Sequence, residues 1–486
     1  MSNFYHGVKA SQVATSISTP VIAKSGIHFI VGTSPIHTMN GKTNEIVIAN
    51  NYAEAVKQLG FNDDFEKYTI CEEIYTAFKL YNVSPVIFVN VLDPNKHFTE
   101  AAPEDYTLKS GIVKLPFEAL KDTLKVKGYT DNVLNSDAYE IGVDFDVLYT
   151  EDSLKLEILE GGKITDENAI LNIGFNKIDV SKVTSGDIIG GYDINTRKNT
   201  GLELINYVYP KFNLIPDIII APKWSQNSEV AAVMAGKAEN INGIFRGKAI
   251  IDVDTKEVKT YSETIEWKKK NNITQPSQIL VFPKVKLGEK IFNYSTHLAG
   301  LMTKTDNDAN LGNNSPCESA SNKTLQIDGT VLSDGEELIL DLEQANYLNA
   351  NGIVTVNNFS GSFVSWGNYT ACYPSNTDVK DYFYCVSRMF DWIGNTVILS
   401  CWNKVDKKLS NALVESIVQS ISIWFNGLKS AGIICGGRIE YLKEENSAID
   451  LLAGKLKFHI YIAPPVPAQE IEFLIEYDVS YLENIA

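Results

Sequence analysis

The segment at residues 85–92, PVIFVNVL, is apolar at nearly every position. A strand with one face in water alternates apolar and polar side chains, so this unbroken run predicts a strand that is covered on both faces. Residues 27–31, IHFIV, form a similar run, and an amphipathic stretch at residues 69–81 between the two has helical spacing. Strand, helix and strand in this order predict a largely parallel sheet with helices on both sides, an α/β fold.

Capping residues predict where two helices begin. Asn51 is suited to accept a hydrogen bond from the first turn of a helix at residues 52–59, and Gly60 is suited to end it, because glycine adopts the left-handed conformation without a steric cost. Thr69 and Glu72 have the spacing of a capping box at the start of the next helix. Both helices lie between the first two predicted strands.

The α/β pattern returns in the second half of the chain. Strands are predicted at residues 216–222, 247–253 and 278–282, with a helix at about residues 230–238. These strands would extend the same parallel sheet. The turn-forming residues at 310–316 predict a long surface loop after it.

Residues from about 100 to 190 have a different pattern. Short alternating segments at residues 139–143, 154–159 and 169–173 are separated by Gly, Asp and Asn turns. This pattern predicts a small β-sandwich or barrel. Because the α/β pattern occurs both before and after this stretch, we expect the β domain to be inserted into a loop of the α/β domain.

The last part of the chain predicts a compact α+β unit. A helix of about six turns is predicted at about residues 407–429, and residues 455–462 alternate like a strand with one buried face. The apolar stripe of the helix consists of Leu409, Leu413, Ile417, Ile421, Trp424 and Leu428. We expect the strand to pack on this stripe.

Two segments outside these units predict extended arms that add strands to the sheets of neighbouring subunits. Residues 1–20 lack a helical period and end in a proline, and residues beyond 470 alternate apolar and acidic side chains. Pro464, Pro465 and Pro467 predict a rigid spacer before the second arm, because proline has no amide donor for a strand ladder. The candidate inter-subunit residues of the two arms are Val8, Val13, Ile17, Ile471, Phe473, Ile475 and Tyr477.

These patterns divide the chain into six parts. They are an amino-terminal arm at residues 1–20, the first part of the α/β domain at 21–98, the inserted β domain at 99–192, the second part of the α/β domain at 193–350, a carboxy-terminal α+β domain at 351–467 and a carboxy-terminal arm strand at 468–486.

The charge excludes some classes of partner. The formal net charge is -17, and acidic residues are spread along the whole chain, so the basic stripe that nucleic acid requires is missing. No apolar run is long enough for a membrane span, and the start lacks the features of a signal peptide, which predicts synthesis in the cytosol without membrane insertion. The six cysteines have no metal-ligand spacing, and we expect mostly buried thiols.

Catalytic chemistry finds little support. The six histidines contain no H-E-x-x-H pair, and no glycine-rich phosphate loop follows a predicted strand. Asp217, His297 and Ser315 could be drawn as a hydrolase triad, but no G-x-S-x-G elbow surrounds the serine. Asp252 and Asp254 could bind a metal at a strand end, although such residues more often cap a turn. We therefore predict no catalytic residue, no cofactor and no metal.

The order and spacing of several short motifs resemble the tail sheath proteins of contractile phages and related bacteriocins. The motifs are YHGV at residues 5–8, DIIGG at 187–191, TGLE at 200–203, IAP at 220–222, HLAG at 297–300, TD at 305–306, NANG at 349–352, WG at 366–367 and APP at 463–465. Two stretches depart from the family pattern: residues 307–322 are unusually rich in Asn, and Ser387-Arg388 stands where a basic pair is usual.

The resemblance implies a subtilisin-like α/β domain without a working triad and a structural function. The chain would form a helical homo-oligomer of six-fold rings around a tail tube protein, contact baseplate and tail terminator proteins, and contract to drive the tube through a cell envelope. It would belong to a virion tail or a tail-like particle assembled in the bacterial cytoplasm. The alternative is a degenerate or unrecognised subtilisin-like hydrolase.

Overall fold

The structure is a computed structural model that describes residues 20–39, 41–194, 196–359 and 361–481. Its centre is an eight-stranded sheet. In spatial order the strands are β2 (Ile46–Ala49), β3 (Val86–Asn90), β1 (His28–Gly32), β14 (Ile218–Ile220), β15 (Lys248–Asp252), β16 (Gln278–Val281), β20 (Ile353–Asn357) and β21 (Val364–Trp366). The six inner strands are parallel, and the two edge strands are antiparallel to their neighbours. The predicted mixed α/β fold with a largely parallel sheet is confirmed.

The inner strands are buried on both faces. Every residue of β1, β3, β14, β15, β16 and β20 is buried. Strands covered on both sides read as continuous apolar runs, which is the pattern that the sequence shows at these positions. This sheet therefore holds the main core of the molecule.

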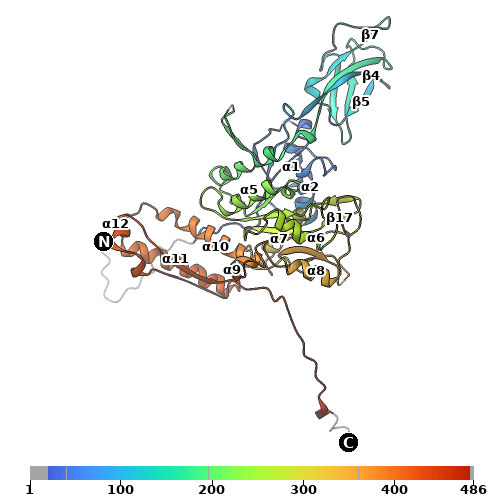
Figure 1. The fold of residues 1–486 in the computed structure, drawn as a ribbon. Helices are drawn as coiled ribbons and strands as arrows, with labels where there is room; N and C mark the ends of the chain where they lie inside the picture. The colour runs from blue at the N-terminus through green and yellow to red at the C-terminus, as the bar shows by residue number, and fades with distance from the viewer. Residues whose placement is uncertain (1–19, 40, 195, 360, 482–486) are drawn as a thin grey trace, which may run out of the picture.

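Helices cover both faces of the large sheet (Figure 1). They are α1 (Tyr52–Leu59), α2 (Thr69–Tyr75), which continues as a π-helix at Thr76–Tyr81, α3 (Ser185–Ile189), α4 (Val208–Phe212), α5 (Ser228–Glu239), α6 (Glu263–Lys270), α7 (Tyr294–Asn307) and α8 (Leu342–Asn349). Twelve of the 14 residues of α7 are buried, so this helix is a core element.

Both predicted helices are present, with α1 beginning at Tyr52 and α2 at Thr69, but only the first of the two predicted caps is confirmed. Asn51 accepts a hydrogen bond from the backbone N–H of Glu54, and Gly60 ends α1 with a φ of +72°. The predicted capping box is wrong. Thr69 Oγ1 accepts a bond from the N–H of Thr33, and the buried Glu72 carboxylate accepts from Asn293, so both side chains serve tertiary contacts instead.

Residues 98–178 form two three-stranded sheets with a core of their own, which project from the body (Figure 1). One contains β4 (Phe98–Thr107), β11 (Ile170–Ile178) and β6 (Lys125–Lys127), and the other β5 (Ile112–Pro116), β10 (Ser153–Ile158) and β9 (Phe145–Tyr149). The small hairpin β7 (Tyr129–Thr130) and β8 (Val133–Leu134) lies beside them. The strand predicted at residues 139–143 is wrong, since only single bridges occur at Tyr139 and Ile141.

Two smaller sheets lie outside the large one. They are the hairpin of β12 (Gly191–Asp193) and β13 (Lys198–Thr200), and the sheet of β17 (Lys284–Leu287), β18 (Lys290–Phe292) and β19 (Gly329–Val331). The loop at residues 310–316 is only partly at the surface, because Gly312, Ser315 and Pro316 are buried. This corrects the predicted surface loop.

The last part of the chain forms a helical unit with a two-stranded sheet. Its elements are α9 (Val379–Tyr382), α10 (Tyr384–Cys401), α11 (Asn411–Ser430), β22 (Gly436–Glu440), α12 (Ala448–Leu452) and β23 (His459–Ala463). The rings of Trp392 in α10 and Trp424 in α11 lie 5.6 Å apart, so the two helices pack side by side (Figure 1).

Three predicted boundaries in this part need correction. β20 and β21 belong to the large sheet, although residues from 351 onward were predicted to start a separate domain. The predicted helix at 407–429 begins later, because Ser410 caps α11 and leaves Leu409 outside it and exposed. The predicted strand at 455–462 begins only at His459.

Candidate assembly site

The carboxy-terminal arm, residues 468–481 as described, leaves the body as a single extended segment (Figure 1). Ile471, Phe473, Ile475 and Tyr477 are 70%, 82%, 94% and 76% exposed. Residues 470–478 contain neither a helix nor a strand in the isolated chain. Among the described residues of its own subunit, the apolar face of this segment has no partner.

The proline spacer sits at the root of this arm. Pro464 is buried against the body, while Pro465 and Pro467 are half-buried. Each proline fixes its own φ near -65° and favours an extended backbone. The spacer therefore sets the direction in which the arm leaves the subunit.

We call the two-stranded sheet of β22 and β23 the ribbon. One of its faces packs on α11: Ile439 is buried, and Gly437 allows the close approach, because a Cβ there would lie 3.1 Å from the Phe425 ring. Arg438 and Tyr461 are paired on the other face, with the guanidinium carbon 4.0 Å from the ring centroid. The ribbon thus has one apolar, covered face and one polar face.

Both long edges of the ribbon are open. Within the described residues neither β22 nor β23 pairs with a further strand. A two-stranded sheet is only marginally stable alone, and open edges present unpaired N–H and C=O groups to any strand that fits. The ribbon is therefore a candidate acceptor for an added strand.

The amino-terminal candidates Val8, Val13 and Ile17 lie outside the described residues. The described chain begins at Pro20. From there it runs along α10, where the N–H of Val21 donates to Ser400 Oγ at 3.0 Å.

The candidate triad is not assembled. Ser315 is buried and donates to the carbonyl of Gly312. Nδ1 of His297 lies 3.2 Å from the Tyr81 hydroxyl, and burial lowers the pKa of this histidine to about 3. Asp217 accepts hydrogen bonds from the backbone N–H groups of residues 26 and 27. Each of the three side chains is thus committed to a different structural contact.

The candidate metal ligands serve the backbone. Asp252 accepts from the N–H and the hydroxyl of Ser295 at 2.9 and 2.5 Å, which caps the buried start of α7. Burial raises the pKa of Asp252. Asp254 accepts from the N–H of Lys256 at 2.8 Å and so closes a turn. Among the described residues, no three His, Cys, Asp or Glu side chains are grouped to hold a metal ion.

The cysteines are free thiols, as expected from their spacing. Cys71, Cys317, Cys372 and Cys385 are buried, and only Cys435, next to the ribbon, is exposed. In the described part of the chain, no helix is long and apolar enough to cross a bilayer.

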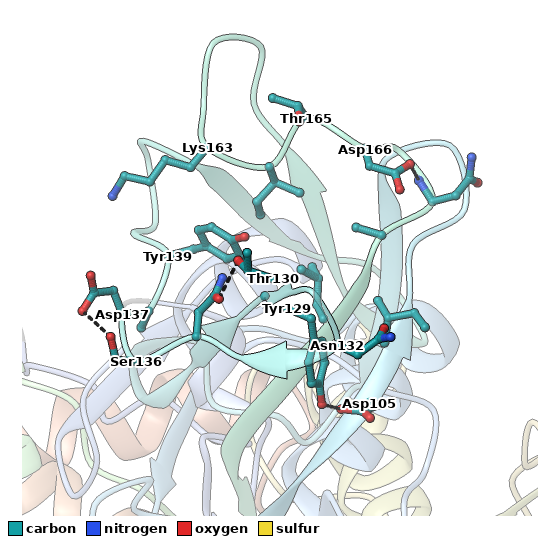
Figure 2. A pocket seen from close by; sticks show the side chains of 18 residues that line it. Asp105, Tyr129, Thr130, Asn132, Ser136, Asp137, Tyr139, Lys163, Thr165 and Asp166 are labelled. Carbon is teal, nitrogen blue, oxygen red and sulfur yellow. Dashed lines mark hydrogen bonds between the residues drawn. The ribbon is translucent and has the colours of Figure 1, made fainter.

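A polar crevice of about 1080 Å³ opens between the loops of the small β sheets (Figure 2). Its walls carry carboxylates, amides and hydroxyls that mostly bond to one another: Tyr129 donates to Asp105 at 2.7 Å, and Thr130 donates to Asn135 at 2.8 Å (Figure 2). Part of the polar lining is therefore satisfied without a ligand.

The sequence analysis missed two features around the assembly site. The ribbon face of Arg438 and Tyr461 was missed because β22 is only five residues long. The second feature is a buried charge cluster around Arg388, which donates to Asp306 and Asp217 at 2.6 and 3.1 Å. Its signal in the sequence is the presence of only two charged residues, Arg388 and Asp391, in the otherwise uncharged helix α10.

Comparison with known proteins gives relatives along the full chain. No protein-family model matches. The tail sheath protein of Burkholderia phage BcepMu is 25% identical over 495 residues, covering 99% of this chain and 98% of that protein. A prophage major tail sheath protein of Pseudomonas aeruginosa strain UCBPP-PA14 is 25% identical over 327 residues, covering 65% of this chain and 78% of that protein.

Solved structures share the fold at lower identity. The helical sheath of the anti-feeding prophage in the contracted state matches with a TM-score of 0.58 and 12% identity over 97% of this chain and 99% of that chain. The sheath complex of an extracellular contractile injection system, PVC, gives 0.57 and 11% over 99% of both chains. A chain of the six-fold symmetrised baseplate of the anti-feeding prophage gives 0.57 and 12% over 98% and 100%. The resemblance indicated by the sequence motifs is confirmed: the relatives of this chain in sequence are tail sheath proteins, and its relatives in fold are proteins of contractile injection systems.

Proposed function

We propose that this chain is a structural subunit of a contractile tail sheath, which polymerises around a tail tube and contracts to drive the tube through a cell envelope. The observation that carries the proposal is an exposed apolar arm on the same subunit as a ribbon with two open edges. A chain with these two features, which is similar to the tail sheath protein of phage BcepMu over 99% of its length, is suited to link copies of itself. The alternative of a degenerate hydrolase is not supported.

The link between copies is strand addition. The arm of one subunit would pair with an open edge of the ribbon of a neighbour, and its apolar face would pack on the apolar side of that sheet. Burying Phe473 or Ile475 in this way is worth roughly 1.5 to 3 kcal/mol for each side chain. Glu470, Glu472 and Glu476 on the opposite face would repel unspecific edge pairing.

The amino-terminal arm would act in the same way. The candidates Val8, Val13 and Ile17 precede a segment that is anchored along α10. A strand formed by residues 1–18 would therefore leave the subunit near the helical unit that carries the ribbon. With two arms, each subunit would hold two neighbours. This connectivity suits a helical polymer whose members slide without separating.

Further partners follow from the sheath function. Baseplate association is supported by the match to a chain of the anti-feeding prophage baseplate, whose six-fold symmetry also supports six-fold rings here. The tail tube protein and the tail terminator are proposed as the remaining partners. The particle would be a phage tail or a tail-like particle, assembled in the host cytoplasm, with no direct contact to nucleic acid.

The body would be a catalytically silent relative of the subtilisin-like domain, with residues 99–192 as an inserted β domain. Ser315, His297 and Asp252 are each bound to structural partners, which supports a structural function for all three. Substituting any of them by Ala should change thermal stability at most. Loss of contraction in an assembled sheath of one such variant would contradict this part of the proposal.

The size of the assembly tests the proposed function. Full-length chain should form long hollow tubes in the electron microscope, whereas chains that lack residues 1–18 or 468–486 should sediment as folded monomers. A full-length chain that remains a small particle and turns over a peptide substrate would point to the hydrolase instead. Normal tubes from both truncated chains would disprove strand addition by the arms.

A further inference from the structure

Helix α10 has a buried polar face. Arg388, Asp391 and Asn395 follow each other at three- and four-residue spacing, so they lie on one side of the helix. Arg388 and Asn395 are each 3% exposed, and the Asp391 side chain is 13% exposed. We call these three residues the seam, because they face the large sheet along the helix.

The amino-terminal end of the seam is a charge cluster. Arg388 donates to both carboxylate oxygens of Asp306, at 3.1 and 2.6 Å, and to Asp217 at 3.1 Å. Asp306 lies in the last turn of α7, and Asp217 precedes β14. One guanidinium thus connects α10 to a core helix and to the amino-terminal edge of the large sheet.

The other two seam residues continue along the same edge of the sheet. Asp391 lies 2.7 Å from Nζ of Lys248, the first residue of β15. Asn395 accepts from the N–H of Arg246 at 3.0 Å and donates to the carbonyl of the same residue at 2.8 Å. All three contacts of the seam therefore reach the start of β14 or β15 or the end of α7.

A second side of α10 holds the start of the described chain. Ala23 accepts from Trp392 Nε1 at 2.8 Å and donates to Thr396 Oγ1 at 3.1 Å, and Val21 donates to Ser400. The chain then turns into the charge cluster, where Ser25 Oγ donates to Asp306 at 2.6 Å. The root of the amino-terminal arm and the seam are thus joined through the same helix.

Trp392 also connects α10 to the elements of assembly. Its ring packs against Trp424 of α11, and α11 carries the ribbon. We call α11, the ribbon and the carboxy-terminal arm the assembly unit. Among the contacts described, α10 is the element that touches the assembly unit, the amino-terminal root and the large sheet together.

Buried ion clusters are poor sources of stability. Removing two or three charges from water costs free energy, and this cost offsets most of the gain from their mutual attraction. A protein in which apolar residues of similar size replace the charges is often as stable or more stable. A buried guanidinium instead restricts the orientation of its partners, because its N–H groups point in fixed directions and bond well only over a narrow range of angles. A buried Arg between two carboxylates on different elements is therefore better suited to set an orientation than to hold the fold together.

We propose that α10 is the junction that fixes the orientation of the assembly unit relative to the large sheet, and that the fork of Arg388 on Asp306 and Asp217 is the part of the seam that sets this orientation. In the polymer, α10 then holds the assembly unit and the amino-terminal root, which continues into β1, in one fixed arrangement, so that neighbouring bodies move together. This consequence rests on the proposed sheath function, whereas the orientation itself is a property of the single chain.

The test compares distances between two spin labels in the full chain. The labels replace the exposed Ile423 of α11 and the exposed Glu229 of α5 by Cys, in a chain carrying Cys435→Ser and Cys401→Ala, diluted with unlabelled chain. The parent should give one narrow distance distribution. The neutral seam variant Asp217→Asn, Asp306→Asn, Arg388→Met should lose the narrow peak and give a broad distribution, with its thermal transition retained.

The matched control is Lys269→Met, which removes an exposed charge from α6 and should keep the narrow peak. A narrow, unshifted peak in the folded seam variant would overturn the proposal. If that variant fails to fold, Arg388→Lys decides, since it keeps the charge but loses the two-pronged fork: a broadened peak supports the junction, and the parent's peak overturns it. A chain that forms no tubes would refute the proposed function without affecting this result.

Discussion

Strand β20 and the carboxy-terminal arm are both short segments rich in β-forming apolar residues, yet they have opposite surroundings. All five residues of β20 are buried between β16 and β21 of the large sheet. Residues 471–477 of the arm are all exposed in the isolated subunit. β20 carries apolar or small uncharged side chains on both faces, whereas the arm places glutamates on one of its two faces.

The difference shows which sheet each segment can join. A strand with carboxylates on one face cannot lie inside a sheet covered on both sides, because burying an unpaired charge costs several kcal/mol. It can join a sheet that has one covered face and one face in water, and the ribbon has this construction. In the proposed sheath, the body is therefore complete within one subunit, and the arm and the ribbon are completed between subunits.

The largest expected effect is the loss of polymerisation when the apolar face of the arm becomes charged. Phe473→Asp with Ile475→Asp should leave no tubes in the electron microscope, because two carboxylates would have to enter the apolar side of the neighbouring sheet. The thermal transition of the monomer should stay nearly unchanged, since both side chains are more than four-fifths exposed.

The matched control for this pair lies on the other face of the arm. Leu474 is 81% exposed and shares that face with the glutamates, so Leu474→Asp should still allow tubes to form. A double variant whose monomer loses its thermal transition would show instead that the arm belongs to the core of its own subunit.

A substitution in the large sheet should have the opposite effect and change the stability of the monomer. Phe29 in β1 is fully buried, and Phe29→Ala should lower the free energy of unfolding by about 3 to 5 kcal/mol through the cavity it leaves. Denaturant titration of the monomer measures this change. An effect below about 1 kcal/mol would contradict the view that the large sheet holds the main core.

A pH experiment sharpens the description of the body. Burial raises the pKa of Glu72 to about 8, against opposing effects of Lys284 and of hydrogen bonds from Asn293. Between about pH 5 and 8 the Glu72 carboxyl is therefore protonated in the folded chain but ionised in the unfolded chain, where its pKa is about 4.3. The free energy of unfolding should fall as the pH rises through this range, by at most about 1.4 kcal/mol per pH unit.

The variant Glu72→Gln carries no titratable proton there and should flatten this pH profile. Gln should also fit, because a flip of the Asn293 amide would turn its buried Oδ1, which has no hydrogen-bond partner among the described residues, toward the new Nε2 in place of the Nδ2 that now donates to Glu72. Thermal unfolding of both chains at several pH values measures the slopes. Equal slopes would show that Glu72 is ionised in the folded chain.

The smallest expected effect concerns the spacer. Replacing Pro465 and Pro467 by Gly should leave the monomer's stability within about 1 kcal/mol, since both residues are only half-buried, but should make the root of the arm flexible. Tubes should still form, with less regular helical spacing in electron micrographs. Tubes as regular as those of the parent would show that the spacer's stiffness has no function in assembly.

Much of the body was predictable because its signals are local. The unbroken runs at β1, β3 and β15 predict strands covered on both faces, and Asn51 caps the helix that its position indicated. The box at Thr69 and Glu72 failed because burial gave both side chains tertiary partners. β20 was assigned to the wrong unit, since sequence order does not show which sheet a strand joins.

The assembly site was predictable only in part. The alternation at residues 471–477 is visible in the sequence, and the exposure of these side chains agrees with a segment that awaits a partner. Of the ribbon, β23 was predicted in part as the strand at residues 455–462, but β22 was missed because it contains two glycines and too few residues for a pattern. The seam depends on contacts between residues as far apart as Ser25 and Arg388, and no local pattern encodes them.

Hydrogen exchange on the assembled protein tests the central claim most directly. In tubes, the backbone amides of residues 471–477 and the outward-facing amides at the ribbon edges, which do not bond between β22 and β23, should become protected together, whereas in the Phe473→Asp, Ile475→Asp monomer both should exchange fast. The account predicts this joint protection because each partner supplies the hydrogen bonds that the other lacks. Tubes in which the ribbon edges or the arm continue to exchange as fast as in the monomer would contradict it.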